Sequence, residues 1–441
     1  MDKEKARRDD QFIDLVVHLN KKINNKKNVQ IRRAGASYEI TCPNPRHPKE
    51  KRGHNSFRCK PDKNGVWRFR CFNEACQSPS GDGFKGDVFD YVQYMLCCDL
   101  PEAARYVAQF YGYELNGEFQ ISDKKRKELT LWKEVATISY YFLTQTWEGK
   151  SKGLKYLRQR GITDESINKF FLGYAPGGVK MKNILLKKGF TEEYLKEKGL
   201  LNKDMNDMFF KRVIFPFPLY GRSIQSDDKY PHLYVKGHNE GLYNYKRART
   251  KETVILSESH LDLIVIDQAL NQLGDGEEKL ADKVGVLSSF GTNGFKEEYI
   301  DNMKNAAIKR IIIVYDGDFE GRKAAIKVGH MLQDHGYIVR IAEMPWDIDP
   351  NEYFTVRKKT NEDFYNLINS AITPIEFEVK FIMDQHITNS FSDKIETIYA
   401  IAPLFEKIKI PNLTGELLVN YISERLGVSK SQVLNAIKKN K

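Results

Sequence analysis

Four apolar runs between residues 250 and 350 place the strongest constraint on the fold of this chain. In order they read TVILS, VGVLSSF, RIIIVYD and YIVRIAEM, and amphipathic stretches of roughly 10–15 residues separate them. Short apolar runs that alternate with helical stretches predict parallel strands joined by crossover helices. Residues 250–358 are therefore predicted to form a domain with a parallel sheet.

Acidic side chains stand where these predicted strands end. They follow the first, third and fourth runs and are Glu258, Asp316, Asp318 and Asp349. Ligands of an open parallel sheet bind outside the carboxyl ends of its strands. Gathered carboxylates repel one another unless a cation lies between them, and oxygen ligands select Mg²⁺ or Mn²⁺. We therefore predict that these four acids form a catalytic metal site. The alternative for each of them is a helix cap.

Two pairs of soft ligands near the N-terminus have the spacing of a zinc site. Cys42 and His47 form the first pair, and Cys71 and Cys76 form the second, with four residues between the members of each pair. Two such pairs, separated by a strand hairpin, can close a tetrahedral site. Four protein ligands leave no position for a catalytic water, so we predict structural zinc. The alternatives are unrelated buried thiols or, in place of His47, one of two other residues, His54 and Cys59.

Basic and aromatic residues interleave in short strand-like runs between residues 208 and 237. Cationic side chains suit phosphate groups, and an exposed tyrosine can stack on an unpaired base. We therefore predict a surface that binds nucleic acid or nucleotides, whose members are Arg212, Arg222, Lys229, Tyr234 and Lys236. The alternative is a sheet face whose charges serve only solvation.

Composition shifts divide the 441 residues into five segments. The predicted zinc-binding domain spans residues 1–115. Residues 116–130 are polar and charged without aliphatic periodicity, which predicts a linker. The basic strands lie in 131–249, the parallel sheet in 250–358, and a helical bundle in 359–441. The predicted fold class is α+β and multidomain, with a small zinc-ribbon-like domain, a mixed α/β core that contains the parallel sheet, and a C-terminal helical bundle.

The composition excludes several classes of protein. Hydrophobic residues make up 41% of the chain, which excludes a disordered chain. No apolar stretch reaches the roughly 18–20 residues of a membrane span, and no secretion signal starts the sequence. Six cysteines are too few for a disulfide scaffold, so we expect a reducing compartment. A formal net charge of +11 permits an acidic partner such as nucleic acid.

The combination of these motifs resembles the DnaG-type primases of bacteria and phages, from about residue 12 to residue 435. ASYEITCP and GDVFDYV resemble parts of the zinc-binding domain of that family. FLGYAP resembles the start of its RNA-polymerase domain, and YDGDFEGR resembles its Toprim fold. The chain departs from the family at three points. The zinc-ligand pairs are spaced by four residues where the family has two, Ser259 replaces a glycine, and Asn351 stands where the family often has aspartate.

The resemblance implies a DNA primase, a nucleotidyltransferase that copies single-stranded DNA into short RNA primers for replication. It implies ribonucleoside triphosphates as substrates, structural zinc, and catalytic Mg²⁺ or Mn²⁺ on the four acids. It adds Arg322 to the residues that bind nucleic acid or nucleotides. A replicative helicase and a single-strand-binding protein are expected partners. The expected location is the cytoplasm of a bacterial cell or of a phage-infected host.

Two other functions fit parts of the sequence. Toprim also occurs in nucleases and topoisomerases, so a DNA-processing enzyme of that kind is one alternative. A non-catalytic, zinc-dependent DNA-binding protein of replication is the other. No G-x-x-x-x-G-K-[ST] motif occurs, which argues against a fused ATP-driven helicase.

Overall fold

The computed structural model describes most of the chain, namely residues 1–24, 29–42, 57–72, 85–96, 100–114, 123–217, 219–235, 237, 241–275, 278–291, 294–304, 306–386, 390–405 and 413–439. These residues form two compact units. The first consists of Met1–Glu252, Lys283–Gly285 and Glu298–Lys309. The second consists of Thr253–Asp282, Val286–Glu297 and Arg310–Lys441.

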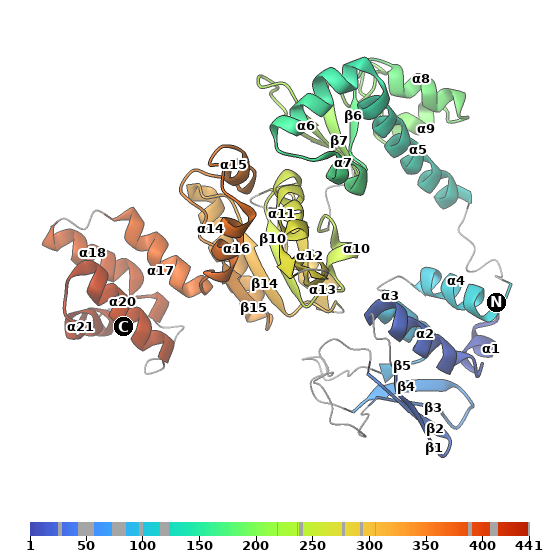
Figure 1. The fold of residues 1–441 in the computed structure, drawn as a ribbon, viewed down its shortest axis with the longest axis horizontal. Helices are drawn as coiled ribbons and strands as arrows, with labels where there is room; N and C mark the ends of the chain where they lie inside the picture. Colours follow the sequence, from blue (N-terminus) through green and yellow to red (C-terminus); the bar gives the residue numbers. More distant parts are fainter. Residues whose placement is uncertain are drawn as a thin grey trace. The chain divides into compact units, whose positions relative to one another are not determined.

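The N-terminal part of the first unit contains a five-stranded sheet whose strands follow one another in chain order (Figure 1). All four pairings are antiparallel. The strands are β1 (Ile31–Ala34), β2 (Ser37–Ile40), β3 (Phe57–Pro61), β4 (Trp67–Cys71) and β5 (Lys85–Gly86). The helices are α1 (Lys3–Arg7), α2 (Phe12–Asn24), α3 (Val88–Leu96) and α4 (Leu100–Tyr111).

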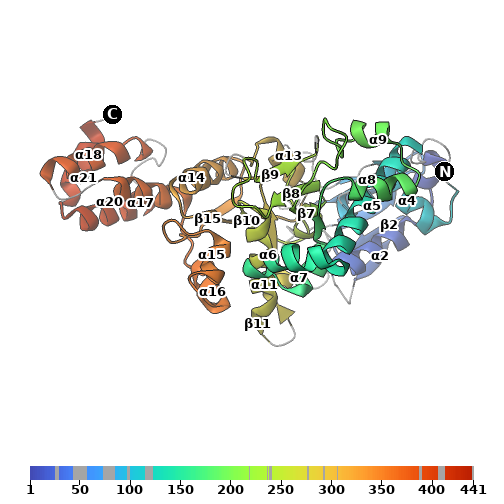
Figure 2. The ribbon, with the colours of Figure 1, turned by 90° about the horizontal axis from the view of Figure 1, so that it is seen from above.

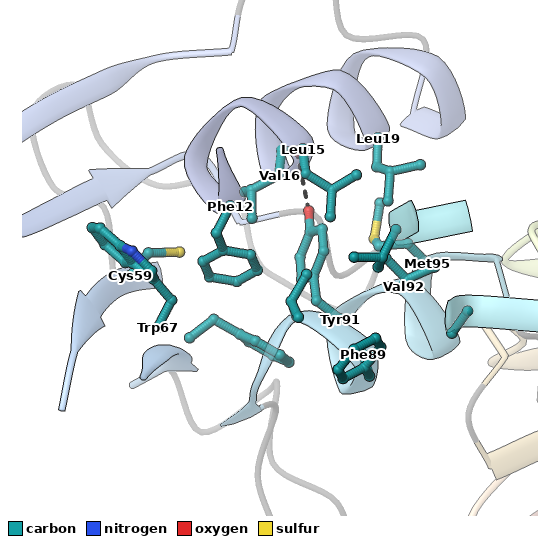
Figure 3. Close-up of a cluster of buried hydrophobic side chains, with 14 of the residues drawn as sticks. Phe12, Leu15, Val16, Leu19, Cys59, Trp67, Phe89, Tyr91, Val92 and Met95 are labelled. Carbon is teal, nitrogen blue, oxygen red and sulfur yellow. Dashed lines mark hydrogen bonds between the residues drawn. The ribbon is translucent and has the colours of Figure 1, made fainter. Parts of the chain in front are cut away.

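Alternation along β3 and β4 decides which face of this sheet is covered. Phe57 and Cys59 of β3, and Phe69 and Cys71 of β4, are buried, whereas the residues between them are exposed. Figure 3 shows side chains of α2, α3 and the sheet meeting in one core. The buried hydroxyl of Tyr91 in that core donates to the carbonyl of Val16 at 3.2 Å. One face of the sheet is therefore apolar and the other is polar.

The rest of the first unit begins with the long helix α5 (Asp123–Gln145). The prediction that residues 116–130 form a linker differs from the structure at Asp123–Thr130, which belong to α5. These residues are helical but mostly exposed, so no apolar periodicity marks them, although Lys, Arg and Glu favour helix. The helical elements that follow are a π-helix (Gly149–Leu154), α6 (Lys155–Gln159), α7 (Asp164–Phe170), α8 (Lys180–Lys187), α9 (Glu192–Glu197), α10 (Tyr245–Ala248) and α13 (Glu298–Lys304).

The predicted basic strands are confirmed as strands of a second antiparallel sheet in the first unit. Its order is β6-β7-β8-β9. The strands are β6 (Gly173–Ala175), β7 (Arg212–Pro216), β8 (Leu219–Ser223) and β9 (His232–Tyr234).

The second unit contains a four-stranded sheet in the order β13-β10-β14-β15 (Figure 1). β10 pairs with β14, and β14 pairs with β15, in parallel, as the alternating apolar runs predict. The strands are β10 (Thr253–Ser257), β13 (Val284–Ser288), β14 (Arg310–Val314) and β15 (Ile338–Ile341), and a small hairpin consists of β11 (Gly274–Asp275) and β12 (Glu278–Lys279). The helices between and after these strands include α11 (His260–Gln272), α12 (Leu280–Lys283), α14 (Phe319–Asp334), α15 (Pro350–Thr355) and α16 (Asn361–Asn369).

The predicted C-terminal helical bundle is confirmed (Figure 2). Its helices share a core of aliphatic and aromatic side chains that includes Phe405 and Ile422. They are α17 (Pro374–Gln385), α18 (Phe391–Ile401), α20 (Leu413–Leu426) and α21 (Lys430–Lys439). Among the helices that the structure describes, none is both long and apolar enough to cross a membrane.

Candidate metal and nucleic-acid sites

The four predicted catalytic acids lie at the carboxyl edge of the parallel sheet. Glu258 follows β10, Asp316 lies two residues after β14, and Asp318 begins α14. Asp349 begins α15 in the connection that follows β15. Burial, followed by the negative charges of Asp262 and of the other three acids, raises the pKa of Asp316 well above its usual range. The fold therefore brings the predicted acids close enough to repel one another.

Two of these acids also cap helices. Asp318 Oδ1 accepts a hydrogen bond from the N–H of Gly321 at 2.7 Å, and Asp349 Oδ1 accepts one from the N–H of Glu352 at 2.5 Å. The alternative role as a helix cap is therefore confirmed for Asp318 and Asp349. Each cap uses one carboxylate oxygen, so it does not by itself exclude a metal-binding role.

Asp262 is a fifth acid at this edge and was absent from the predicted site. Its side chain is buried, and its pKa is raised by burial first and then by the charge of Asp349. Ser259 Oγ lies 2.5 Å from Asp262 Oδ2, and the N–H of Asn351 donates to Asp262 Oδ1 at 3.2 Å. Its position four residues after Glu258, on the first turn of α11, was the sequence signal that could have identified it.

The edge has the chemistry of a divalent-cation site, although its carboxylates are not gathered around one point. Among the residues that the structure describes, no three Asp, Glu, His or Cys side chains are close enough together to hold a metal ion. Asp316 Oδ1 is nevertheless buried without a hydrogen-bond partner among these residues. A cation would offset both this desolvation and the repulsion between the carboxylates.

The prediction that Arg322 binds nucleotides is not supported by its position. Its guanidinium group is buried, with Nε donating to the carbonyl of Gly317 at 3.0 Å and Nη2 donating to the carbonyl of Met344 at 2.6 Å. Burial lowers its pKa. Arg322 therefore joins the loop after β14 to the loop after β15. The N–H groups of its guanidinium that make these bonds point at backbone carbonyls rather than at solvent.

The position of Arg212 does not support its predicted role in binding nucleic acid or nucleotides either. It is buried on β7, and its guanidinium group donates to the carbonyl of Pro231 at 3.1 Å and to that of Tyr230 at 2.7 Å. Asp228 Oδ2 lies 2.8 Å from Nη2. Arg212 therefore holds the connection between β8 and β9, which explains why a cation occurs in an otherwise apolar strand.

The remaining predicted residues of this sheet fall into three groups. Arg222 of β8 is partly buried, and its Nη1 contacts Nε2 of His232 on the neighbouring strand. Tyr234 is also partly buried and stacks on Tyr220, with ring centroids 4.7 Å apart. Lys229 is exposed and lies over the ring of Tyr230, which is 62% exposed. Lys236 lies outside the described residues.

The predicted zinc ligands are described only in part. Cys42 follows β2 and Cys71 ends β4, and their Sγ atoms are 3.7 Å apart. Two thiolates on one tetrahedral zinc ion, each at about 2.3 Å, would lie about 3.8 Å apart, so this pair fits zinc. Three residues lie outside the described part of the chain, His47, His54 and Cys76.

Cys59 does not fit the alternative role of zinc ligand. It lies among the apolar side chains of the core in Figure 3, and this burial raises the pKa of its thiol. In the ladder of β3 and β4, Cys59 lies opposite Phe69, whereas Cys71 lies opposite Phe57, so Cys59 is two positions along the strand from the thiol pair. Within the described residues, no third ligand joins Cys42 and Cys71.

The five-stranded sheet carries a basic face that was not predicted from the sequence. Arg58 of β3 lies opposite Arg70 of β4, and Lys60 lies opposite Arg68, on the exposed side of both strands. Arg58 Nη2 lies 3.0 Å from Glu39 Oε1 of β2, and Arg68 Nε lies 3.2 Å from Asp62 Oδ2. These acids offset part of the repulsion between the opposed cations. Phe72 next to the basic face is 53% exposed, with the guanidinium groups of Arg58 and Arg70 at 5.6 and 5.1 Å from its ring centroid.

This basic face consists of Arg58, Lys60, Arg68, Arg70 and Lys85, with Phe72 at its edge. An exposed aromatic ring among cations is the chemistry that binds single-stranded nucleic acid. The period-two placement of cations in FRCKP and WRFRC was the signal in the sequence.

Comparisons with known proteins show similarity to DNA primases. Residues 140–224 match the family model for the N-terminal domain of the DNA primase catalytic core, and residues 255–354 match the Toprim-like model. A curated DNA primase of Clostridium acetobutylicum is 26% identical over 431 residues, which cover 93% of this chain and 66% of that protein. One of Enterococcus faecalis is 28% identical over 445 residues, covering 91% of this chain and 64% of that protein. The chain thus spans about two thirds of the length of these relatives.

The fold also resembles solved structures. The zinc-binding and RNA polymerase domains of the Aquifex aeolicus primase align with a TM-score of 0.51 and 22% identity, over 98% of each chain. At this identity the likeness establishes the fold alone. The predicted fold class and the resemblance seen in the motifs are both confirmed.

Proposed function

We propose, because this chain is related to the DnaG-type primases, that it is a DNA-dependent RNA polymerase that makes short RNA primers on single-stranded DNA. The observation that carries this proposal is the group of acids at the carboxyl edge of the Toprim-like sheet, with Asp316 buried among like charges. Such a group suits metal-assisted nucleotidyl transfer from ribonucleoside triphosphates. A nuclease would use similar acids, so the products decide between the two.

The acids at this edge of the sheet would bind the catalytic metal ion. Asp316 and Glu258 follow directly from neighbouring parallel strands and would bind Mg²⁺ or Mn²⁺ together with Asp318 and Asp349. The ion would neutralise phosphate charge and favour the ionised form of the attacking hydroxyl. Because Asp318 and Asp349 are fixed as helix caps, their carboxylates have little freedom to reorient. The protein therefore contributes mainly positioning and electrostatic stabilisation.

The N-terminal domain would bind the template. The basic face and Phe72 offer cations for the phosphates of single-stranded DNA and a ring for one base. Zinc on Cys42 and Cys71, with Cys76 and His47 as the proposed further ligands, would tie the end of β2 to the end of β4. Zinc held there would have a structural role.

The domain boundaries, the partners and the cellular location are also proposals. We assign residues 1–115 to the zinc-binding domain, 131–249 and 250–358 to the polymerase core, and 359–441 to a helical subdomain. A replicative helicase and a single-strand-binding protein are the proposed partners, and the cytoplasm is the proposed location. Arg222 and Lys229 stay candidates for contact with template or nucleotide.

Synthesis on unprimed single-stranded DNA tests the function. Labelled ribonucleotides and Mg²⁺ or Mn²⁺ would be given to the zinc-loaded wild type, to Asp316→Asn, and to the control Asp334→Asn, which changes an exposed acid on α14. We expect short labelled RNA from the wild type and the control but not from Asp316→Asn. Shortened DNA without new RNA would indicate a nuclease instead. Equal RNA synthesis by all three proteins would remove Asp316 from the catalytic site.

A further inference from the structure

Three aromatic side chains of the second unit contact one another. Phe319 and Trp346 are 44% and 40% exposed, while Phe381 of α17 is buried. The ring centroid of Phe381 lies 5.4 Å from that of Phe319 and 6.4 Å from that of Trp346, with the latter pair stacked at 23°. Phe381 thus supports two rings that each keep a large part of their surface in solvent. We refer to these three residues as the aromatic trio.

The two exposed rings are carried by the same loops as the acids. Phe319 directly follows Asp318, and Trp346 precedes Asp349 by three residues. The N–H of Gly317 donates to the carbonyl of Ile348 at 2.9 Å, which joins one loop to the other. A Cβ atom at Gly317 would come within 1.8 Å of the Pro345 carbonyl oxygen, so glycine is required for this approach. The aromatic trio is therefore held in a fixed relation to the acids.

Cations lie against the faces of both exposed rings. The guanidinium carbon of Arg322 is 4.1 Å from the ring centroid of Trp346, and Nζ of Lys323 is 5.4 Å from that of Phe319. Arg322 is fixed by its hydrogen bonds to the carbonyls of Gly317 and Met344, so its guanidinium group holds the indole ring in place. The arrangement is a rigid aromatic platform with positive charge at its base, which suits a flat ligand that carries anionic groups.

We propose that Trp346 and Phe319 stack on the base of a nucleoside triphosphate whose phosphates are bound through metal at the neighbouring acids. The proposal deepens the proposed function and rests on it, since it assigns a base-binding subsite to the same catalytic edge. A protein partner fits this surface less well, because a specific protein interface buries about 800 Å² per partner, far more than two half-exposed rings offer. A nucleobase matches them in size and has a π face of its own.

The experiment compares two ligands that differ in the base. Binding of Mg–ATP and of Mg–tripolyphosphate, which lacks base and sugar, would be measured by calorimetry on the full zinc-loaded chain. The variants are Trp346→Leu and Phe319→Leu, which remove the π face but keep an apolar side chain. Trp346→Phe keeps an aromatic ring, and Phe391→Leu changes an aromatic residue of α18 that is 72% exposed and lies outside the aromatic trio.

We expect the dissociation constant of Mg–ATP to rise about 5-fold to 20-fold in Trp346→Leu and Phe319→Leu. That of Mg–tripolyphosphate should change less than about twofold, because the metal and phosphate contacts stay intact. Trp346→Phe should recover most of the affinity for Mg–ATP, and Phe391→Leu should match the wild type. Unchanged melting temperatures of the Leu variants would confirm that the effect is on binding.

Two results would overturn the subsite. Equal losses for both ligands would mean that the rings act only by positioning the acids, and unchanged affinity for Mg–ATP would mean that no base stacks there. Neither result depends on RNA synthesis, so a failure of the subsite is distinguishable from a failure of the polymerase assay. If the chain makes no RNA but the ligand difference is found, the subsite stands as a nucleotide-binding site.

Discussion

The carboxylate of Asp262 accepts a hydrogen bond from the backbone N–H of Asn351, across a sequence separation of 89 residues. Asp262 lies in the first turn of α11 and Asn351 in the first turn of α15, so this bond ties together two helices that begin at the catalytic edge. Glu258 and Asp349 lie just before these two helices. The bond therefore fixes the relation between two of the proposed metal ligands.

Removal of the Ser259 hydroxyl should loosen this arrangement. Ser259 caps α11 by accepting from the N–H of Asp262, and its hydroxyl lies 2.5 Å from Asp262 Oδ2. We expect Ser259→Ala to lower the local stability of α11 by about 1–2 kcal/mol. Hydrogen exchange of the α11 amides in metal-free protein would measure this loss. Ser259→Thr keeps the hydroxyl and should exchange like the wild type, whereas equal exchange rates for the Ala variant would contradict the prediction.

The hairpin of β8 and β9 should weaken at acidic pH because of His232. Partial burial, followed by the charges of Arg222 and Arg212, lowers the pKa of His232 to about 4. Since Arg222 can only donate, Nε2 of His232 must accept, and Nδ1 then donates to the hydroxyl of Tyr220 at 2.7 Å. The folded protein thus favours the neutral ring.

The sign of this pH effect follows from the lowered pKa. Between pH values of about 6.5 and 4, His232 is protonated in the unfolded chain but neutral in the folded hairpin. The free energy of unfolding therefore falls as the pH falls. Above a pH of about 6.5 the contribution is fully present. Melting temperatures of the wild type and of His232→Gln, compared across this range, should converge as the pH falls. The effect should be modest because His232 is exposed on β9, where solvent screens the neighbouring charges. A constant difference between the two proteins would exclude His232 as its source.

Replacing Arg58 and Arg70 together by glutamine should weaken the binding of single-stranded DNA. Each arginine that contacts a phosphate of single-stranded DNA adds about 0.7 to the slope of log K against log salt, so the double variant should lose about 1.4. Fluorescence anisotropy with a labelled single-stranded oligonucleotide in increasing NaCl measures this slope. The same change at Lys187 and Lys196, exposed residues of α8 and α9, is the control for net charge. An equal loss of slope in the control would show that the basic face has no special role.

Loss of zinc should release the end of the N-terminal sheet. Cys71→Ser removes one member of the thiol pair, and we expect the purified protein to lose its zinc and the β3–β4 region to become sensitive to protease. Metal analysis and limited proteolysis measure the two effects. Cys59→Ala changes a core thiol of the same sheet and should keep its zinc. Zinc loss in the Cys59 variant, or zinc retention in the Cys71 variant, would reverse the assignment of ligands.

The sequence by itself determined the elements whose evidence is local. The alternation of apolar runs and helical stretches predicts the parallel strands β10, β14 and β15. The residues of β10 are mostly buried, whereas β15 at the edge of the sheet alternates between exposed and buried residues. The same topology places Glu258 and Asp316 at one edge, since the carboxyl ends of parallel strands meet there. These inferences depend only on period and order along the chain.

Only the tertiary structure decided which charged residues face solvent. Arg212 and Arg322 read as phosphate ligands in the sequence, yet both are buried with backbone carbonyls as acceptors. Arg58 and Arg70 were not predicted to bind nucleic acid, yet they lie opposite one another on an exposed face of the sheet. Whether a guanidinium group donates to a backbone carbonyl or to a ligand depends on which segments, distant in sequence, pack around it. A local sequence pattern does not contain that information.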